Sequence, residues 1–237
     1  VDKLTGPAMG RPKSATFRTC DVVGLDTLVH VANGVKDNCP DDERKAVFET
    51  PAFVQHLVDN GHLGSKSGQG FYKKTKVDGK KAILGLDLET LEYRPKPKVK
   101  YATLDAAKPV DDLAARTRIL YDGSDEAGTF YRRVFSDVFA YVTHRIPEIA
   151  DEPYRIDDAL RAGFGWEMGA FETMDAIGAD LEQLYAQVRA AGVALRVDID
   201  PMPSAEVPSA VQLAVFRILQ EALTNALRHG ARAEVSV

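Results

Sequence analysis

The chain has 237 residues, enough for one or two domains with a sizeable buried core. Its 45% hydrophobic and 27% charged residues are typical of soluble globular proteins, which excludes collagen-like, coiled-coil and wholly disordered classes. The formal net charge of −5 gives no basic surface for nucleic acid, so we expect no nucleic-acid partner.

The sequence shows no mark of a membrane or secretory protein. No apolar run approaches the roughly 18 residues of a transmembrane helix, and no signal-peptide pattern opens the chain. Cys20 and Cys39 are too few for a disulfide framework, which favours a reducing cytoplasm. Because the first residue is Val1 rather than Met, we expect a piece of a longer protein.

Helical periodicity is the main structural signal along the chain. Apolar residues recur at i, i+3, i+4 and i+7 over Leu28–Val35, and a shorter stripe over Phe53–Val58 precedes a C-cap at Gly61. A longer stripe spans Tyr131–Val142 and is expected to stop at Pro147. We interpret each stripe as the core-facing side of an amphipathic helix.

Two stretches depart from this helical pattern. Residues 73–109 are rich in Gly, Pro and Lys, and Asp78-Gly79 stands between two β-prone runs, which is typical of a hairpin turn. All fourteen lysines lie at or before Lys108, and the chain from Ala179 on is rich in Ala, Val and Leu. The prolines that we expect to exclude a regular helix in the first stretch are Pro95, Pro97 and Pro109.

An internal repeat is the most informative feature of the sequence. The segment Phe17–Gly24 recurs as Phe171–Gly178, with Phe, Thr, Asp and Gly at the same spacing. We interpret both copies as the same helical corner, with glycines in tight turns, phenylalanine in the core and Asp or Thr capping a helix. Skipping one residue extends the match to two further pairs, Gly10 with Gly165 and Asp2 with Asp157.

These segments resemble the C-terminal region of 3-hydroxyacyl-CoA dehydrogenases. The resemblance begins in Leu4–Thr27 and is nearest to the long bacterial fatty-acid oxidation type, in which this helical domain is duplicated. Leu63–Tyr72 is similar to the Gly-Lys-Gly-Phe-Tyr closure of the first copy, and Ile156–Thr173 is similar to the second. The match covers residues 1–178.

The resemblance implies hydride transfer between NAD and the 3-hydroxyl group of an acyl-CoA. In the family a catalytic His, held by a Glu, is the base, and both belong to an N-terminal Rossmann domain that this chain lacks. The Gly64–Gly70 loop matches neither the dinucleotide fingerprint nor a P-loop, so no NAD site is expected here.

The Asn that orients substrate in the family is also missing. The first copy begins after the helix that carries it, and in the second copy Tyr141–Arg145 places His144 at that position. We therefore expect a packing copy and no residue for hydride transfer in this chain.

The other histidines carry little chemical signal. His30, His56 and His62 have no second His or Cys at zinc-ligand spacing, so no metal role is expected for them. His144 follows the apolar helix, where a cation complements the dipole of the last turn.

The tail from Ala179 follows a different pattern. Val193–Asp200 alternates apolar and polar residues and is predicted as a strand, as is Ala233–Val237. Between them we expect a helix from Pro208 to a C′ stop at Gly230.

One pair of residues on the polar side of that helix could bind a metal ion. Glu221 and Asn225 stand four apart, and their oxygens could hold Mg²⁺ and a water, although the spacing alone favours a solvated polar face. The segment Phe216–His229 resembles the N-box of sensor histidine kinases. That resemblance implies that Glu221 assists phosphoryl chemistry, Asn225 binds Mg²⁺, and Arg228 or His229 approaches the nucleotide phosphate.

The kinase resemblance is incomplete. The later glycine boxes of that family, including the Asp-x-Gly-x-Gly that reads adenine, are absent, and no phospho-accepting His helix precedes the segment. We therefore expect no Mg-ATP binding by this chain alone.

Taken together, the sequence predicts a mainly α fold with two helical repeats and a small β-hairpin, followed by a short, incomplete α/β fragment. The expected domains are a first dehydrogenase repeat without its N-terminal helix (1–72), a hairpin and linker (73–127), the start of a second repeat (128–178) and a truncated kinase-like ATPase fragment (179–237).

Three functions remain open at this point. The first is a fragment of an NAD-dependent 3-hydroxyacyl-CoA dehydrogenase of fatty-acid β-oxidation, a substrate-side and dimerisation region that meets acyl-CoA only with a Rossmann domain. The second is a two-component sensor kinase with the helical part as an accessory module. The third is a non-catalytic interaction scaffold that binds acyl-CoA or pairs its two repeats as a pseudo-dimer.

Overall fold

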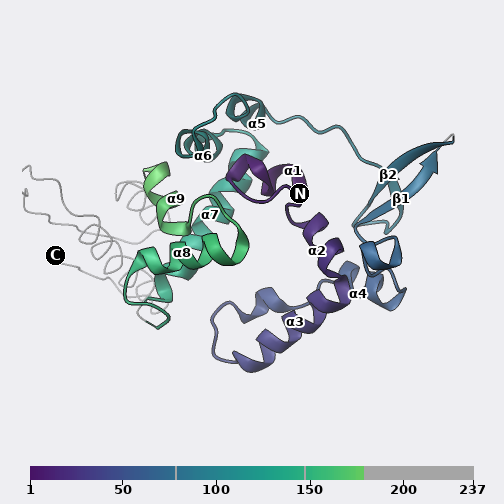
Figure 1. The fold of residues 1–237 in the computed structure, drawn as a ribbon, viewed down its shortest axis with the longest axis horizontal. Coiled ribbons are helices and arrows are strands. Elements are labelled where there is room, and N and C mark those ends of the chain that lie inside the picture. Colours follow the sequence, from purple (N-terminus) through teal and green to yellow (C-terminus); the bar gives the residue numbers. More distant parts are fainter. Residues whose placement is uncertain (78, 147, 179–237) are drawn as a thin grey trace, which may run out of the picture. The chain divides into compact units, whose positions relative to one another are not determined.

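The computed structural model describes residues 1–77, 79–146 and 148–178 (Figure 1). The described residues divide into two compact units: one comprises residues 1–131 and 161–167, and the other comprises 132–160 and 168–178. The strands and helix predicted beyond Ala179 lie outside the described residues.

The described secondary structure is mainly helical, as predicted. No helix among these residues combines the length and the apolar character of a membrane-spanning segment. The elements are α1 (Asp2–Thr5), η1 (Pro7–Met9), α2 (Phe17–Val23), α3 (Leu25–Asn38), η2 (Lys45–Phe48), α4 (Ala52–Asp59), η3 (Ser65–Ser67), β1 (Tyr72–Val77), β2 (Lys80–Leu86), β3 (Tyr93–Pro95), α5 (Ala102–Ala107), α6 (Leu113–Asp122), α7 (Glu126–His144), α8 (Pro153–Phe164) and α9 (Ala170–Ile177).

The predicted hairpin is confirmed and is part of a larger sheet. β1 and β2 pair antiparallel up to Val77 and Lys80, and Gly79 in the turn between them has φ 73°. β3 adds a third antiparallel strand, pairing Leu86 with Tyr93. β3 was not predicted, because it is only three residues long and ends on a proline, which only an edge strand accommodates.

The segment expected as hairpin and linker also contains two helices. The prediction that prolines exclude a regular helix is wrong for α5, which lies between Pro97 and Pro109. A proline restricts its own position and the residue before it, so an uninterrupted run between two prolines still forms a short helix. α6 follows, and Asp112 caps it by accepting a hydrogen bond from the Ala115 amide at 2.7 Å.

Within the described residues, the helices predicted from apolar periodicity form as α3, α4 and α7, but one of the stripes is not buried throughout. In α4, Val54 and Leu57 are buried, and the helix ends just before Gly61, at φ 72°. In α3, by contrast, Val31 is 54% exposed. The expectation of a fully core-facing stripe is wrong there, because the hydrophobic cluster takes only Leu25 and neighbours from the first half of α3.

One hydrophobic cluster in the first unit joins the helices to the sheet. Its buried members include Leu25 of α3, Leu57 of α4 and Phe71, the residue directly before β1. The ring of Phe17 stacks on that of Phe71 with centroids 4.1 Å apart. Figure 1 shows α4 beside the β1–β2 hairpin, so the glycine-rich segment between them is fixed from both sides.

Both copies of the repeat form the same corner, which confirms the structural interpretation. The carboxylate of Asp2 accepts hydrogen bonds from the amides of Phe17 and Arg18 at 2.7 and 3.0 Å. Asp157 does the same for Phe171 and Glu172, at 2.9 and 3.0 Å. A carboxylate placed on the first free amides of a helix satisfies donors that have no partner within the helix.

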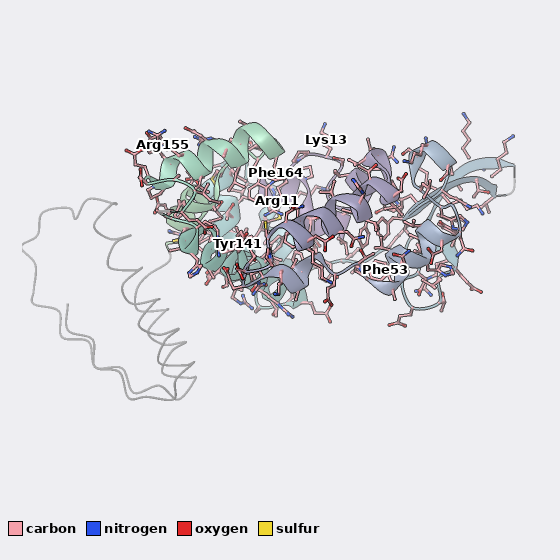
Figure 2. The ribbon with its side chains drawn as sticks, turned by 90° about the horizontal axis from the view of Figure 1, so that it is seen from below. Arg11, Lys13, Phe53, Tyr141, Arg155 and Phe164 are labelled. Carbon is pink, nitrogen blue, oxygen red and sulfur yellow. The ribbon has the colours of Figure 1, made fainter. Side chains whose placement is uncertain are left out.

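The matched glycines also adopt the same conformation. Gly10 and Gly165 have φ of 67° and 63°, a left-handed conformation in which glycine carries no steric penalty. The loops that contain them touch within the first unit: the Glu167 amide donates to the Gly10 carbonyl at 2.8 Å. The Arg11 guanidinium, labelled in Figure 2, lies 3.9 Å above the Trp166 ring.

Candidate functional site

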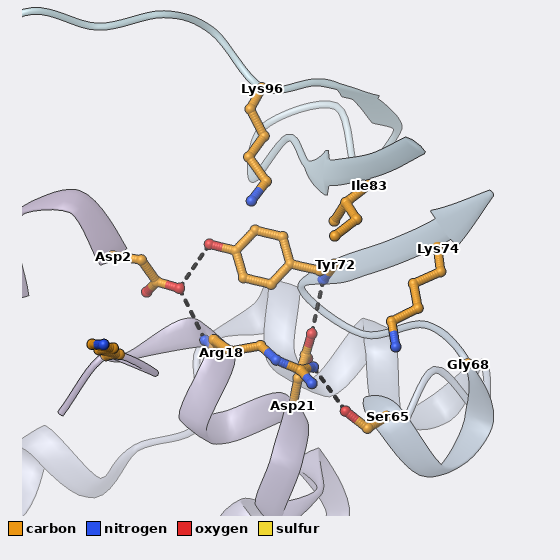
Figure 3. A pocket seen from close by; sticks show the side chains of 10 residues that line it. Asp2, Arg18, Asp21, Ser65, Gly68, Tyr72, Lys74, Ile83 and Lys96 are labelled. Atoms are coloured by element: carbon orange, nitrogen blue, oxygen red, sulfur yellow. Dashed lines mark hydrogen bonds between the residues drawn. The ribbon is translucent and has the colours of Figure 1, made fainter. Parts of the chain in front are cut away.

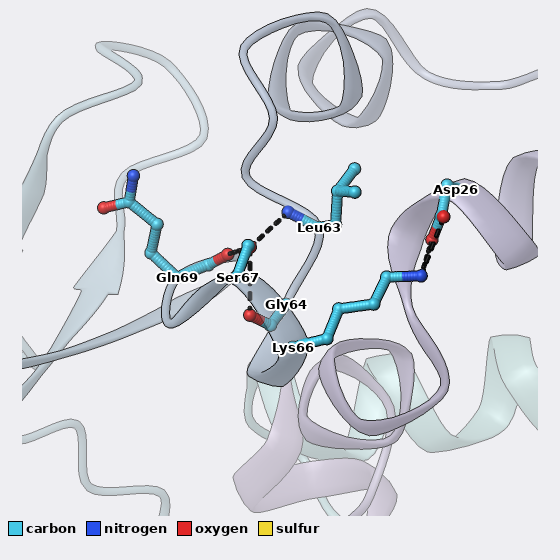
Figure 4. Close-up of polar contacts among 6 residues, drawn as sticks. All are labelled: Asp26, Leu63, Gly64, Lys66, Ser67 and Gln69. Carbon is cyan, nitrogen blue, oxygen red and sulfur yellow. Dashed lines mark hydrogen bonds and ion pairs between the residues drawn. The ribbon is translucent and has the colours of Figure 1, made fainter.

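The glycine-rich segment between α4 and β1 is a self-contained loop (Figure 4). The Gly64 amide donates to the Gln69 carbonyl at 2.8 Å, which closes the loop. The Ser67 hydroxyl accepts from the Leu63 amide at 2.7 Å and donates to the Gln69 carbonyl at 2.9 Å. Lys66 ties the outside of the loop to α3 through an ion pair with Asp26 at 2.6 Å, and this contact lowers the pKa of Asp26.

Asp21 holds the end of this loop against α2. Its carboxylate is 1% exposed and accepts from two consecutive amides, Phe71 at 2.7 Å and Tyr72 at 2.9 Å. Burial raises the pKa of Asp21, and the two amide bonds act in the opposite direction. A Cβ at Gly64 would lie 2.4 Å from the Asp21 carbonyl oxygen, so only glycine lets the loop approach this closely.

This arrangement bears on the NAD that the family resemblance implies. In a dinucleotide site, backbone amides after a glycine-rich turn face the pyrophosphate. Here the amides of Phe71 and Tyr72 already face Asp21, and a Cβ at Gly70 would lie 2.2 Å from the Asp21 carboxylate. The loop therefore does not fit an NAD pyrophosphate.

A cavity of about 370 Å³ opens beside Asp21 in the first unit (Figure 3). Its charged lining is unbalanced, because four cationic side chains face two carboxylates. Both carboxylates already accept hydrogen bonds from neutral donors of the backbone and of Tyr72. The lining residues are Asp2, Lys13, Arg18, Asp21, Ser65, Gly68, Tyr72, Lys74, Ile83 and Lys96.

Tyr72 lies at the centre of this cavity. Its hydroxyl donates to Asp2 at 2.8 Å, and the ammonium group of Lys96 lies 4.1 Å from the ring centroid. Burial and the Asp2 carboxylate raise the pKa of Tyr72, so its hydroxyl remains protonated across the physiological range. The nearby Tyr93 donates to the Gly70 carbonyl at 2.6 Å, and burial raises its pKa to about 12.

The described lining of this cavity contains none of the residues predicted to carry chemistry. Glu221, Asn225, Arg228 and His229 lie outside the described residues. His144 is the exposed last residue of α7, and its neighbour Arg145 pairs with Glu148 at 2.7 Å. Among the described residues, no group of three His, Cys, Asp or Glu side chains is arranged to hold a metal ion.

Sequence reasoning did not anticipate the cationic cavity. Lys13 and Arg18 come from the first corner, whereas Lys74 and Lys96 come from β1 and the residues after β3. These four positions share no spacing pattern, so only the folded backbone relates them. Asp21 did have a signal, because it is part of the repeat, but the repeat gave no indication that its partner is the loop around Gly70.

Comparison with known proteins identifies the family of this chain. The family model described as the C-terminal domain of 3-hydroxyacyl-CoA dehydrogenase matches residues 1–74 and 128–206. The chain belongs to this family. The two matched ranges correspond to the two copies of the repeat, and they leave out 75–127, which contains most of the sheet, α5 and α6.

Several curated proteins are similar to this chain. A Bacillus subtilis protein named "Probable 3-hydroxyacyl-CoA dehydrogenase" is 47% identical over 193 residues, covering 79% of this chain and 24% of that protein. A Psychrobacter fatty acid oxidation complex subunit alpha is 43% identical over 76 residues, covering 32% and 10%. A Mycobacterium tuberculosis 3-hydroxybutyryl-CoA dehydrogenase is 35% identical over 72 residues, covering 30% and 23%.

These matches also bear on the extent of the dehydrogenase part. The chain spans about a quarter or less of the length of these relatives. The family match continues to residue 206 and so passes Gly178, where the sequence predicted a boundary. The matches give no support to a histidine-kinase fragment in 179–237.

Proposed function

We propose that this chain is the substrate-side and dimerisation region of an NAD-dependent 3-hydroxyacyl-CoA dehydrogenase of fatty-acid β-oxidation. The observation that supports this proposal most is the family match, which falls on both copies of the repeat. The clamped loop at Asp21 supports it too, because it is the local structure that the family-like closure Leu63–Tyr72 forms in this chain.

In this proposal the described residues provide shape and positioning, and the base and the NAD site belong to a Rossmann domain. Asp21 fixes the end of the glycine-rich loop with two amide bonds, and Phe71 anchors that end in the hydrophobic cluster. A loop held in this way presents a fixed surface to a neighbouring domain, because its amides and carbonyls are already paired.

The decisive experiment is complementation. The full chain is mixed with a separately produced Rossmann domain of the Bacillus subtilis relative, and oxidation of NADH by acetoacetyl-CoA is followed at 340 nm. We expect turnover in the mixture and none with either part alone. Absence of turnover in a mixture shown by gel filtration to form a complex would contradict the proposal.

We also propose that the two copies pair through their matched loops, as two subunits of a dimer would. The contacts that support pairing are the hydrogen bond from the Glu167 amide to the Gly10 carbonyl and the stacking of Arg11 on Trp166. Arg11 and Trp166 occupy equivalent positions in the two copies. Arg11→Ala is expected to lower the thermal stability of the full chain, with Arg118→Ala, at an exposed position of α6, as control. Equal effects of the two variants would argue against pairing.

A second candidate concerns only the tail, and the pattern of Phe216–His229 is the feature that favours it. If Glu221 and Asn225 belong to a kinase ATPase module, the glycine boxes needed for nucleotide binding would have to follow in the parent gene. We expect no detectable heat when Mg-ATP is titrated into the full chain. Micromolar affinity, or an Asp-x-Gly-x-Gly downstream of Val237 in the parent gene, would instead favour the kinase interpretation.

A further inference from the structure

We propose that one face of the three-stranded sheet binds the surface of an anionic lipid bilayer. This basic sheet face consists of Lys74, Lys76, Lys81, Ile83 and Lys96, all of which are exposed. The contact is peripheral, with side chains among the lipid headgroups and the backbone outside the hydrocarbon. It does not depend on the proposed function above, because it rests on the charge and exposure of this face alone.

The strand register places these side chains on one side of the sheet. β1 and β2 pair Lys74 with Ile83 and Lys76 with Lys81. Residues that stand directly opposite each other share a face of a sheet, as do residues two apart in a strand. Lys96 reaches the same side, because it lines the cavity together with Lys74 and Ile83 (Figure 3). Four cations therefore surround one aliphatic side chain.

The net charge of the whole chain conceals this positive surface. The chain carries −5, whereas residues 73–100 contain nine Lys or Arg and only four Asp or Glu. Of the four acidic residues, Asp78 lies outside the described residues. Asp87 is buried and pairs with Arg94, and the two glutamates lie between β2 and β3, at the opposite end of β2 from the hairpin turn. Positive charge is thus concentrated toward the tip of the hairpin.

The lysines of this face conflict with one another within the fold. Lys76 and Lys81 stand directly opposite each other, and like charges in such a pair destabilise a sheet. Among the described residues, neither these two nor Lys74 and Lys96 form an ion pair with a carboxylate. Local conflicts of this kind are expected at functional surfaces. A layer of negative charge placed against the face would relieve the repulsion.

The side chains of this face favour a bilayer over a nucleic acid. All of its cations are lysines, whereas the planar guanidinium of arginine is better suited to nucleic-acid recognition. Proteins that bind single strands also stack bases on aromatic rings, but here Lys96 covers the ring of Tyr72 at 4.1 Å. Ile83, by contrast, is 55% exposed. Cations around an exposed aliphatic group match anionic headgroups that overlie hydrocarbon.

The experiment is co-sedimentation of the full chain with vesicles. One set contains equal parts of phosphatidylglycerol and phosphatidylcholine, and the other contains phosphatidylcholine alone. The test variant is Lys76→Gln/Lys81→Gln. The matched control, Lys108→Gln/Arg118→Gln, removes the same charge from exposed positions after α5 and in α6.

We expect the unchanged chain to bind only the anionic vesicles. The test variant should bind them at least about tenfold more weakly, and the control should stay within about twofold of the unchanged chain. Salt of about 1 M, where the Debye length is about 3 Å, should release the bound protein.

A second variant separates a bilayer from other polyanions. Ile83→Ser keeps every charge and removes the aliphatic group, so we expect vesicle binding to weaken about fivefold. A short DNA duplex serves as the competing probe. Thermal unfolding followed by circular dichroism shows that each variant folds. The melting temperature of Lys76→Gln/Lys81→Gln should equal or exceed that of the unchanged chain, because the like-charge pair is gone.

The site is overturned if the chain does not sediment with anionic vesicles at low salt, or if the two charge variants weaken binding equally. A lower melting temperature of the lysine variant would show that these lysines stabilise the sheet and would equally contradict the proposal. Tighter binding to the DNA duplex than to vesicles, or full vesicle binding by Ile83→Ser, would overturn the assignment to a bilayer. Because no turnover is measured, failure here is separate from failure of the complementation assay.

Discussion

In this protein a carboxylate clamp is an aspartate side chain that accepts hydrogen bonds from the amides of another segment. The two copies of the repeat share one such clamp and differ in a second. Asp2 and Asp157 each hold the first amides of the following helix. The second pair of matched residues diverges: Asp21 is buried and holds the loop before β1, whereas Asp175 is exposed and accepts no side-chain hydrogen bond from the described residues. A repeated sequence therefore preserves the corner itself, while the role of its final aspartate depends on what packs against it.

This difference has a clear electrostatic consequence. Burial raises the pKa of both Asp21 and Asp175, which means that each carboxylate loses solvation in the fold. Only Asp21 is compensated by two amide donors. The first copy thus contains a buried polar contact that is satisfied, and such contacts are costly to break on one side only.

The largest expected effect comes from removing this clamp. Asp21→Ala leaves the buried Phe71 amide and the Tyr72 amide without an acceptor, and we expect a loss of about 3 kcal/mol in the free energy of unfolding. Asp175→Ala is expected to change it by less than about 0.5 kcal/mol. Urea unfolding of the full chain gives the energies, and hydrogen exchange at Phe71 and Tyr72 localises the change. Equal losses in the two variants would contradict the comparison.

A second contrast lies at the residue two positions before the matched phenylalanines. In the second copy this is Gly169, where a Cβ would lie 2.3 Å from the Asp157 side chain. In the first copy it is Ala15, which has φ 52°. Gly169→Ala is expected to destabilise the chain by about 2 kcal/mol through steric overlap. Ala15→Gly should change stability by less than about 1 kcal/mol, because relief of the left-handed conformation offsets the added flexibility of the unfolded chain.

Thermal unfolding of both variants tests this contrast. A large loss from Ala15→Gly would mean that the two positions are not equivalent. Little loss from Gly169→Ala would mean that Asp157 can move without cost, and the clamp of the second copy would then be weaker than its distances indicate.

The parts of this structure that could be predicted from the sequence are those with a local sequence pattern. Apolar periodicity located α3, α4 and α7, the Asp78-Gly79 turn located the hairpin, and the repeat located both corners. Each of these patterns lies within a short stretch of sequence. The exposure of Val31, the helix α5 and the cationic cavity were not predictable in this way, because each depends on which distant segments meet in the fold.

A third carboxylate clamp, outside both copies, extends the comparison to pH. Asp125 accepts from the hydroxyl and amide of Thr103 at 2.6 and 3.0 Å and from the Gly128 amide at 3.0 Å. These bonds, that from the Thr103 hydroxyl first, lower its pKa to about 2. A carboxylate with a lowered pKa stabilises the fold fully above its ordinary value of about 3.9, and this contribution is lost as the pH falls through about 2.

We therefore expect Asp125→Asn to lower the melting temperature at pH 7, by less than Asp21→Ala does, because Asp125 is only half-buried whereas Asp21 is fully enclosed. The deficit should shrink as the pH falls from about 4 toward 2, since the carboxyl of the unchanged chain becomes protonated over this range. Melting curves of the unchanged chain and of Asp125→Asn, recorded at a series of pH values, measure this deficit. A deficit that stays constant down to pH 2 would show that Asp125 acts through its shape rather than its charge.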